Sequence, residues 1–136
     1  MVAMESINVA SRIDLEFTIN ASPGILFNRL STPSGLSEWF ADNVNVDDNV
    51  YTFFWDKTAN KAQLINVKEN KCIRFSWLND DGTIDTESYF EFRISQQELT
   101  GELALHVTEQ LSEDNTEDAT SLWNYQIGEL KRILGV

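Results

Sequence analysis

Side chains that could carry acid–base or nucleophilic chemistry are few and isolated in this sequence. His106 is the only histidine and Cys72 the only cysteine, and both stand in alternating apolar segments. A catalytic triad or a tetrahedral metal site requires several such groups together. We therefore expect no catalytic residue and no bound metal, and we expect Cys72 to serve as a small apolar core residue.

Carboxylates are plentiful, but their positions suit turns and a helix end. Asp80-Asp81 lies in a turn sequence. Asp114, Glu117 and Asp118 lie where a helical pattern begins, and negative charge is favourable there. The sequence contains no calcium-loop pattern and no phosphate-binding glycine motif. We therefore expect no cofactor.

The aromatic residues have the most functional potential. Four Trp, eight Phe and three Tyr are many for a chain of 136 residues. Large flat side chains suit either a packed core or the walls of an apolar cavity, and the sequence leaves both interpretations open. In the second interpretation, the ligand-binding residues are Trp39, Phe40, Phe75, Trp77, Tyr89, Phe90, His106, Trp123 and Ile127.

Apolar pockets usually carry a few polar groups that orient the ligand. Tyr89, His106 and Gln126 are the candidate anchors, chosen from their register alone. Trp55 is expected on the other face of its strand, away from the cavity. No Lys or Arg falls on the faces assigned to the cavity, so a flat apolar ligand is favoured over an anionic one.

The elements that would position these residues begin with a strand over residues 12–20. Apolar residues from Ile13 to Ile19 alternate with polar ones, which predicts one buried face. Ser22-Pro23 and Thr32-Pro33 each combine a hydroxyl N-cap with a proline at the first helical position. They predict two helices of about two turns each.

The chain from residue 43 to residue 111 reads as short alternating segments separated by turns, and the period then changes. The predicted strands cover residues 44–46, 51–55, 61–68, 72–78, 86–95 and 102–111. From Asn115 to Leu134 apolar residues recur every 3.6 positions, which predicts a long amphipathic helix. Its apolar stripe should face the sheet through Leu122, Trp123, Ile127 and Leu130.

This order of elements predicts an α+β fold of the helix-grip type in a single domain, residues 1–136. A strand and two short helices come first, followed by a six-stranded antiparallel meander and a long C-terminal helix. A twisted sheet must cover its apolar face, and only the last helix is long enough to do so. We expect that helix to pack across the curved sheet.

Several short motifs also resemble those of one family. They are Ala21-Ser22-Pro23, Leu26-Phe27, Leu30-Ser31-Thr32-Pro33, Leu36-Ser37-Glu38-Trp39-Phe40 and the run from Ile73 to Trp77. In this order they resemble the START-like (SRPBCC-type) superfamily, nearest to the branch similar to the activator of the heat-shock-protein ATPase. The sequence departs from that branch at 46–49, where a Gly-Gly-rich strand start is common, and at Leu122-Trp123, which lacks the usual Gly before Trp.

The resemblance implies a helix-grip fold and, often, an apolar ligand between the sheet and the last helix. The leading expectation is therefore a module that binds an apolar or aromatic small molecule. A protein-interaction or chaperone-associated module without a ligand is the alternative. A cyclase- or aromatase-like enzyme ranks last, because proton transfer needs polar residues that face inward, and the sequence offers few.

Charge and leader signals restrict the partners and the location. The chain has 22 acidic and 10 basic residues, a net charge of −12, which repels nucleic acid and anionic membranes. No apolar run approaches the roughly 20 residues that a membrane helix needs. Residues 1–11 do not resemble a leader, and a lone cysteine suits a reducing compartment. We expect a cytoplasmic protein that neither binds nucleic acid nor inserts into membranes.

Overall fold

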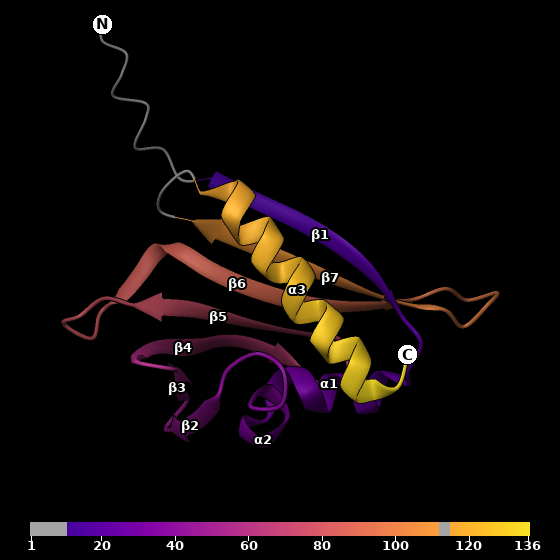
Figure 1. Ribbon diagram of the computed structural model, residues 1–136, viewed down its shortest axis with the longest axis horizontal. Helices are drawn as coiled ribbons and strands as arrows, with labels where there is room; N and C mark the ends of the chain where they lie inside the picture. The colour runs from indigo at the N-terminus through magenta and orange to yellow at the C-terminus, as the bar shows by residue number, and fades with distance from the viewer. Residues whose placement is uncertain (1–10, 112–114) are drawn as a thin grey trace, which may run out of the picture.

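A single antiparallel sheet of seven strands curves around one long helix in the computed structural model, which describes residues 11–111 and 115–136 (Figure 1). The strands are β1 (Ser11–Ile19), β2 (Asn43–Asp47), β3 (Val50–Trp55), β4 (Thr58–Lys68), β5 (Cys72–Leu78), β6 (Ile84–Gln96) and β7 (Leu103–Leu111). The helices are α1 (Pro23–Ser31), α2 (Pro33–Leu36) and α3 (Thr116–Leu134). The predicted helix-grip fold is confirmed. Asp114 and residues 1–10, which are not expected to be a leader, lie outside the described residues.

The strand order is β1-β7-β6-β5-β4-β3-β2. Strands β2 to β7 therefore form the predicted six-stranded meander, in which each strand pairs with the next one along the chain. The first strand joins the last, because Ser11 pairs with Leu111 and Ile19 pairs with Leu103. Alternation in β1 follows the sequence prediction: Ile13 and Ile19 are buried, and the charged residues between them are exposed.

The two helix starts work as their sequences predict. The Ser22 hydroxyl accepts a hydrogen bond from the backbone N–H of Ile25 at 3.3 Å, and the Thr32 hydroxyl accepts one from Gly35 at 2.9 Å. The expected length of the second helix is wrong, however, because α2 is a single turn. It ends at Leu36 because the following residues turn inward, and they bury Trp39 and Phe40 in the core.

The α3 helix lies across the sheet, and α1 and α2 lie near its C-terminal end (Figure 1). Its predicted bounds are confirmed, with Asn115 at the N-cap position and Gly135 in the left-handed conformation, φ 78°, at the C-cap. Trp123, Ile127 and Leu130 are buried as predicted. Among the described residues, no helix is both long enough and apolar enough to cross a bilayer.

The predicted inward position of Leu122 is wrong. Its side chain is 56% exposed, while the next residue, Trp123, is 4% exposed. Successive residues of a helix point about 100° apart, so only one of these neighbours can face the centre of the sheet. The larger side chain takes the core position, and Leu122 is left at the edge of the interface.

Aromatic rings fill the space between the sheet and α3. The ring of Phe40 lies at the centre, with centroid distances of 5.1 Å to Phe53, 5.3 Å to Phe90 and 5.7 Å to Trp123. Rings at such distances are in direct contact. The middle of the groove is therefore a packed core, and a place for a ligand must be sought at its edge.

Candidate ligand-binding cleft

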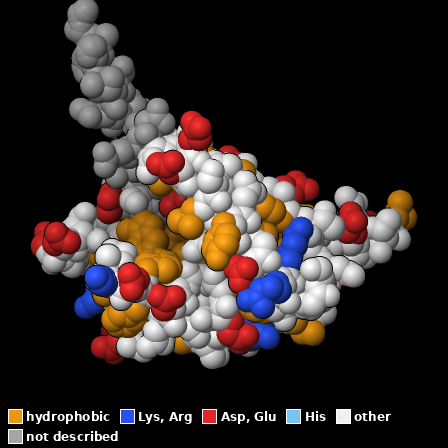
Figure 2. Space-filling view, in the orientation of Figure 1, with side chains coloured by type: hydrophobic (Ala, Val, Ile, Leu, Met, Phe, Trp, Pro, Cys, Tyr) orange, Lys and Arg blue, Asp and Glu red, His pale blue; other side chains and the backbone are white. Residues whose placement is uncertain are grey.

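A cleft of about 570 Å³, open to solvent, lies where α3 meets the segment that follows α2. It is lined by Ser37, Glu38, Trp39, Phe40, Ala41, Asp42, Trp55, Leu122, Tyr125, Gln126 and Glu129. The space-filling view shows hydrophobic side chains gathered on the face that α3 crosses, with acidic side chains among and beside them (Figure 2). Three separate parts of the chain thus build this cleft: residues 37–42, Trp55 of β3, and the α3 helix.

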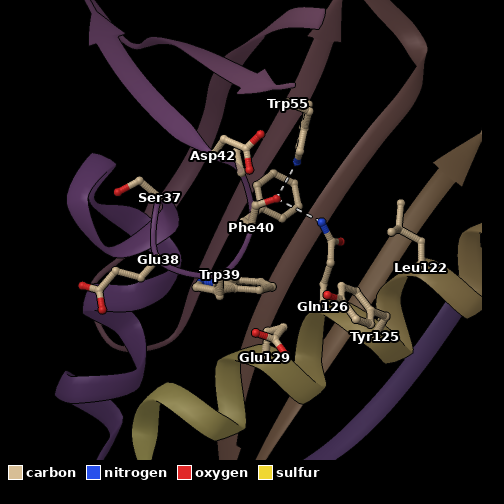
Figure 3. A pocket seen from close by; sticks show the side chains of 11 residues that line it. Ser37, Glu38, Trp39, Phe40, Asp42, Trp55, Leu122, Tyr125, Gln126 and Glu129 are labelled. Atoms are coloured by element: carbon tan, nitrogen blue, oxygen red, sulfur yellow. Dashed lines mark hydrogen bonds between the residues drawn. The ribbon is translucent and has the colours of Figure 1, made fainter. Parts of the chain in front are cut away.

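One backbone carbonyl holds the three parts together. The carbonyl oxygen of Phe40 accepts a hydrogen bond from the indole N–H of Trp55 at 2.7 Å and from the side-chain amide of Gln126 at 3.0 Å (Figure 3). Trp55 belongs to β3 and Gln126 to α3. The floor of the cleft is therefore fixed by two bonds to a single atom.

Gln126 presents an acceptor to the cleft. Its side chain is 8% exposed, and its amide nitrogen must face the Phe40 carbonyl because two oxygens would repel one another. The amide oxygen therefore points away from that carbonyl, on the side of Leu122 and Tyr125 (Figure 3). No hydrogen bond from the described residues reaches this oxygen, and it retains contact with solvent. It can accept a hydrogen bond from a bound molecule.

The walls of the cleft are aromatic and aliphatic. Trp39 is 6% exposed and is fixed by a 2.8 Å bond from its indole N–H to the carbonyl oxygen of Arg29. On the opposite wall, Tyr125 is 68% exposed and Leu122 is 56% exposed. A ligand that covered Tyr125 and Leu122 would remove apolar surface from water, and this burial would favour binding.

Acidic groups border the cleft, and its lining includes no Lys or Arg. Glu38 forms an ion pair with Arg29, and Glu129 accepts a 2.7 Å hydrogen bond from Arg132. That hydrogen bond lowers the pKa of Glu129, so Glu129 is ionised at neutral pH. Asp42 accepts a 2.7 Å bond from the backbone N–H of Asp56, and among the described residues no ion pair reaches it.

Of the predicted ligand-binding residues, the structure brings Trp39 and Phe40 to the cleft together with the candidate anchor Gln126. Four others are buried in the core behind it: Phe75, Phe90, Trp123 and Ile127. Trp77 is half-buried against Phe90 and Trp55, next to the cleft but outside its lining.

Two of the candidate anchors lie on the outer face of the sheet, so neither can contact a molecule in this cleft. Tyr89 is adjacent to the buried Phe90, and the guanidinium of Arg74 lies 4.2 Å from the centre of its ring. His106 lies between the buried Leu105 and Val107. Side chains alternate along a strand, so the neighbours of core residues must face outward.

Trp55 and Tyr125 are site residues that the sequence prediction missed. Trp55 shares the inner face of β3 with Tyr51 and Phe53, although it was expected on the outer face. Aromatic residues occupy both faces of β3, so its sequence does not show which face is buried. Tyr125 carries only a faint signal, because it is an exposed aromatic residue on the polar side of a helix.

The outer face of the sheet carries a serine, histidine and glutamate on adjacent strands. The Nε2 atom of His106 lies 2.9 Å from the Ser95 hydroxyl, and its Nδ1 atom lies 3.7 Å from a carboxylate oxygen of Glu16. The second distance exceeds a hydrogen bond. The hollow beside Glu16 and His106 does not include Ser95, so a molecule bound there would not meet the hydroxyl. We interpret this group as polar surface contacts.

Glu109 is a carboxylate on the inner face of β7, beneath α3, and the sequence prediction did not single it out. It continues the inward alternation of Leu105 and Val107. Its carboxylate accepts a 2.7 Å hydrogen bond from the indole N–H of Trp123. Burial raises the pKa of Glu109, and the hydrogen bond from Trp123 opposes this effect. Elsewhere in the described chain, no three His, Cys, Asp or Glu side chains gather as metal ligands would.

Comparison with known proteins settles the family. A family model of the START-like superfamily domain matches residues 7–136. The chain belongs to the START-like superfamily. The resemblance that its sequence motifs indicated is therefore confirmed. No curated protein sequence matches this START-like chain.

Solved structures share the START-like fold over almost the whole chain. The protein BfR322 from Bacteroides fragilis is 35% identical, with a TM-score of 0.63, over 92% of this chain and 91% of that one. Aha1 from Colwellia psychrerythraea, solved as a dimer, is 15% identical, with a TM-score of 0.75. The match covers 89% of this chain and 93% of that one. MLL2253 from Mesorhizobium loti is 16% identical, with a TM-score of 0.76. The match covers 92% of this chain and 97% of that one. The last two likenesses concern the fold alone.

Proposed function

We propose that this START-like protein binds a small, mainly apolar molecule in the cleft between α3 and the segment after α2. The observation that carries the proposal is the amide oxygen of Gln126. It belongs to a side chain that is nine-tenths buried, it accepts no hydrogen bond from the described residues, and it faces an open cleft. Apolar walls with one fixed polar group are typical of small-molecule sites.

The cleft suits a ligand better than the interior does. Its volume of about 570 Å³ lies within the range of roughly 300–1,000 Å³ that ligand pockets have. In the interior, the rings of Phe75 and Phe90 stack at 5.0 Å, which leaves no space between them. We therefore assign Phe75, Phe90, Trp123 and Ile127 a supporting role and place contact with the ligand at Trp39, Phe40, Trp55, Tyr125 and Gln126.

Nuclear magnetic resonance of the four tryptophan indole N–H groups tests this proposal. We expect titration with a neutral aromatic probe, 1-naphthalenemethanol, to shift the Trp39 and Trp55 signals in a saturable manner. Smaller shifts are expected at Trp77 and Trp123, which lie outside the cleft lining. Tyr125→Ala should weaken binding by up to about tenfold, because it removes one aromatic contact of roughly 0.5–1.5 kcal/mol.

Leu99 provides the matched control. It is 99% exposed in the turn between β6 and β7, so Leu99→Ala removes exposed apolar surface far from the cleft. The Leu99→Ala variant should bind the probe with the same affinity as the unchanged protein. Equal weakening by Leu99→Ala and Tyr125→Ala, or no saturable shift with any neutral aromatic probe, would contradict the proposal.

The alternative is a protein-interaction module, and the exposed side chains of Leu122 and Tyr125 favour it. If that alternative holds, Tyr125→Ala weakens self-association or capture of a protein partner while small probes never bind. A cyclase-like enzyme has less support, because Glu109 faces inward but does not line the cleft. Both the absence of a catalytic residue and the cytoplasmic location stay predictions.

A further inference from the structure

The cleft has few hydrogen-bond donors left to offer. The indole N–H groups of Trp39 and Trp55 donate to backbone carbonyls, as does the amide of Gln126. The Ser37 hydroxyl donates to the carbonyl oxygen of Ser34 at 2.9 Å. Of the described side chains that line the cleft, this leaves the Tyr125 hydroxyl and the second N–H of the Gln126 amide as donors.

Backbone donors in the lining are used as well. Each backbone N–H from Ser37 to Asp42 donates to a carbonyl oxygen of an earlier residue or of β3. The carbonyl oxygen of Leu36 alone receives three of these bonds, at 2.8 to 3.4 Å. A bound anion would have to give up its hydration shell and would find few donors to replace it.

Acceptors, in contrast, are available on several sides. Asp42 lies beside Trp55, and Glu129 lies at the other end of the cleft near Trp39 and Tyr125 (Figure 3). The Glu129 contact with Arg132 is an exposed pair on one helix, and pairs of that kind are weak. The amide oxygen of Gln126 lies on the side of Tyr125 and Leu122 (Figure 3).

The aromatic rings add attraction for positive charge. A ring carries negative charge density on its face, so a cation placed over Trp or Tyr is favoured. The Trp39 and Trp55 rings are held by their N–H groups, and Tyr125 is the exposed ring opposite. A positively charged hydrogen-bond donor is therefore favoured by these rings, by the two carboxylates and by the amide oxygen.

We infer that the cleft selects molecules that carry a protonated amine on an apolar body, over neutral or anionic molecules of the same shape. This inference rests on the proposed binding at the same cleft. The ammonium group donates hydrogen bonds to the Gln126 amide oxygen and lies near Asp42. The apolar body covers Tyr125 and Leu122.

Calorimetric titration with three probes of similar size tests the selection. The probes are 1-naphthylmethylammonium, 1-naphthalenemethanol and 1-naphthoate, compared at pH 7 and low salt. We expect the amine to bind about tenfold more tightly than the alcohol, from one exposed cation–π contact and one exposed charge pair. The carboxylate should bind more weakly than the alcohol.

The Asp42→Asn variant tests whether a charge in the cleft, rather than the net charge of the protein, determines the affinity for the amine. Asn keeps an acceptor for the N–H of Asp56, so the fold should survive. We expect a loss of about three- to fivefold in affinity for the amine and a smaller change for the alcohol. The control is Glu98→Gln, in the turn between β6 and β7, which removes one negative charge at a distant place and should leave both affinities unchanged.

The outcomes distinguish this inference from the proposal beneath it. Equal affinity for the amine and the alcohol overturns the selection and leaves the binding function standing. An equal loss from Glu98→Gln and Asp42→Asn also overturns it, because the net charge of −12 would then explain the preference. Failure of all three probes to bind overturns the binding function, and the selection with it.

Discussion

At the scale of single residues, Glu109 makes the stability of the fold depend on pH. Burial raises its pKa above that of the unfolded chain, so the folded protein keeps a proton that the unfolded chain releases. The stabilisation is complete below the unfolded pKa and is lost as pH rises through the folded pKa. Above the folded pKa, the ionised carboxylate beneath α3 is therefore a cost to the fold.

Glu109→Gln should remove that cost. The amide oxygen of Gln can still accept the bond from Trp123, and the side chain no longer ionises. We expect a higher urea midpoint at pH 8 and a flatter dependence of the midpoint on pH between about pH 4 and pH 8. Glu98→Gln, which changes an exposed carboxyl, serves as the control. An unchanged pH slope in Glu109→Gln would show that another group sets it.

Trp123 supports the core from α3. Its side chain is 4% exposed, and it contacts Phe40 and Phe92. We expect Trp123→Ala to lower the free energy of unfolding by roughly 3–5 kcal/mol, measured by urea denaturation. Trp123→Phe should cost less, because a ring remains. A loss under about 1 kcal/mol in Trp123→Ala would be incompatible with a core position.

Alternation in the sequence predicts side-chain direction well where one face of a strand is polar. The β1 strand and the inward face of β5 follow their sequences for this reason. Tyr89 and His106, the candidate anchors on β6 and β7, both face outward, as the alternation of their strands requires. The sequence could not predict the role of the Phe40 carbonyl as an acceptor, because every residue carries the same backbone oxygen.

At the scale of elements, the contact between α1 and α2 depends on one glycine. A Cβ atom on Gly35 would lie 2.3 Å from the carbonyl oxygen of Asn28, which is far inside van der Waals contact. The close approach fixes how α2 packs against α1, just before Trp39 and Phe40 enter the core. The sequence predicts both helix starts from Ser-Pro and Thr-Pro, but it gives no sign of this approach or of the short α2.

Gly35→Ala should therefore destabilise the protein by roughly 1–3 kcal/mol and weaken probe binding in the cleft. Gly128→Ala is the contrasting variant. Gly128 lies exposed within α3 with nothing near its Cβ position, so alanine should stabilise the helix by about 0.5–1 kcal/mol. Urea denaturation of both variants checks the two signs. Stabilisation by Gly35→Ala would mean that α1 can move aside freely.

At the scale of the whole molecule, the order of elements was predictable because each step has a strong local signal. Caps, turns and the change of period from two to 3.6 identify the strands and helices, and a curved sheet needs one long helix to cover it. The position of the cleft was not predictable in this way. It depends on whether the rings close the groove, and that is decided by the packing of Phe40 against three other elements.

The pairing of β1 with β7 has a consequence for synthesis on the ribosome. Ser11 is made 100 residues before its partner Leu111. Until then β1 has no neighbour in the sheet, and its apolar face has nothing to cover it. Contacts between such distant segments form slowly, and partly folded chains with unpaired strands are prone to aggregate. The finished sheet, and the helix that it grips, can therefore assemble only after β7 and α3 have both been made.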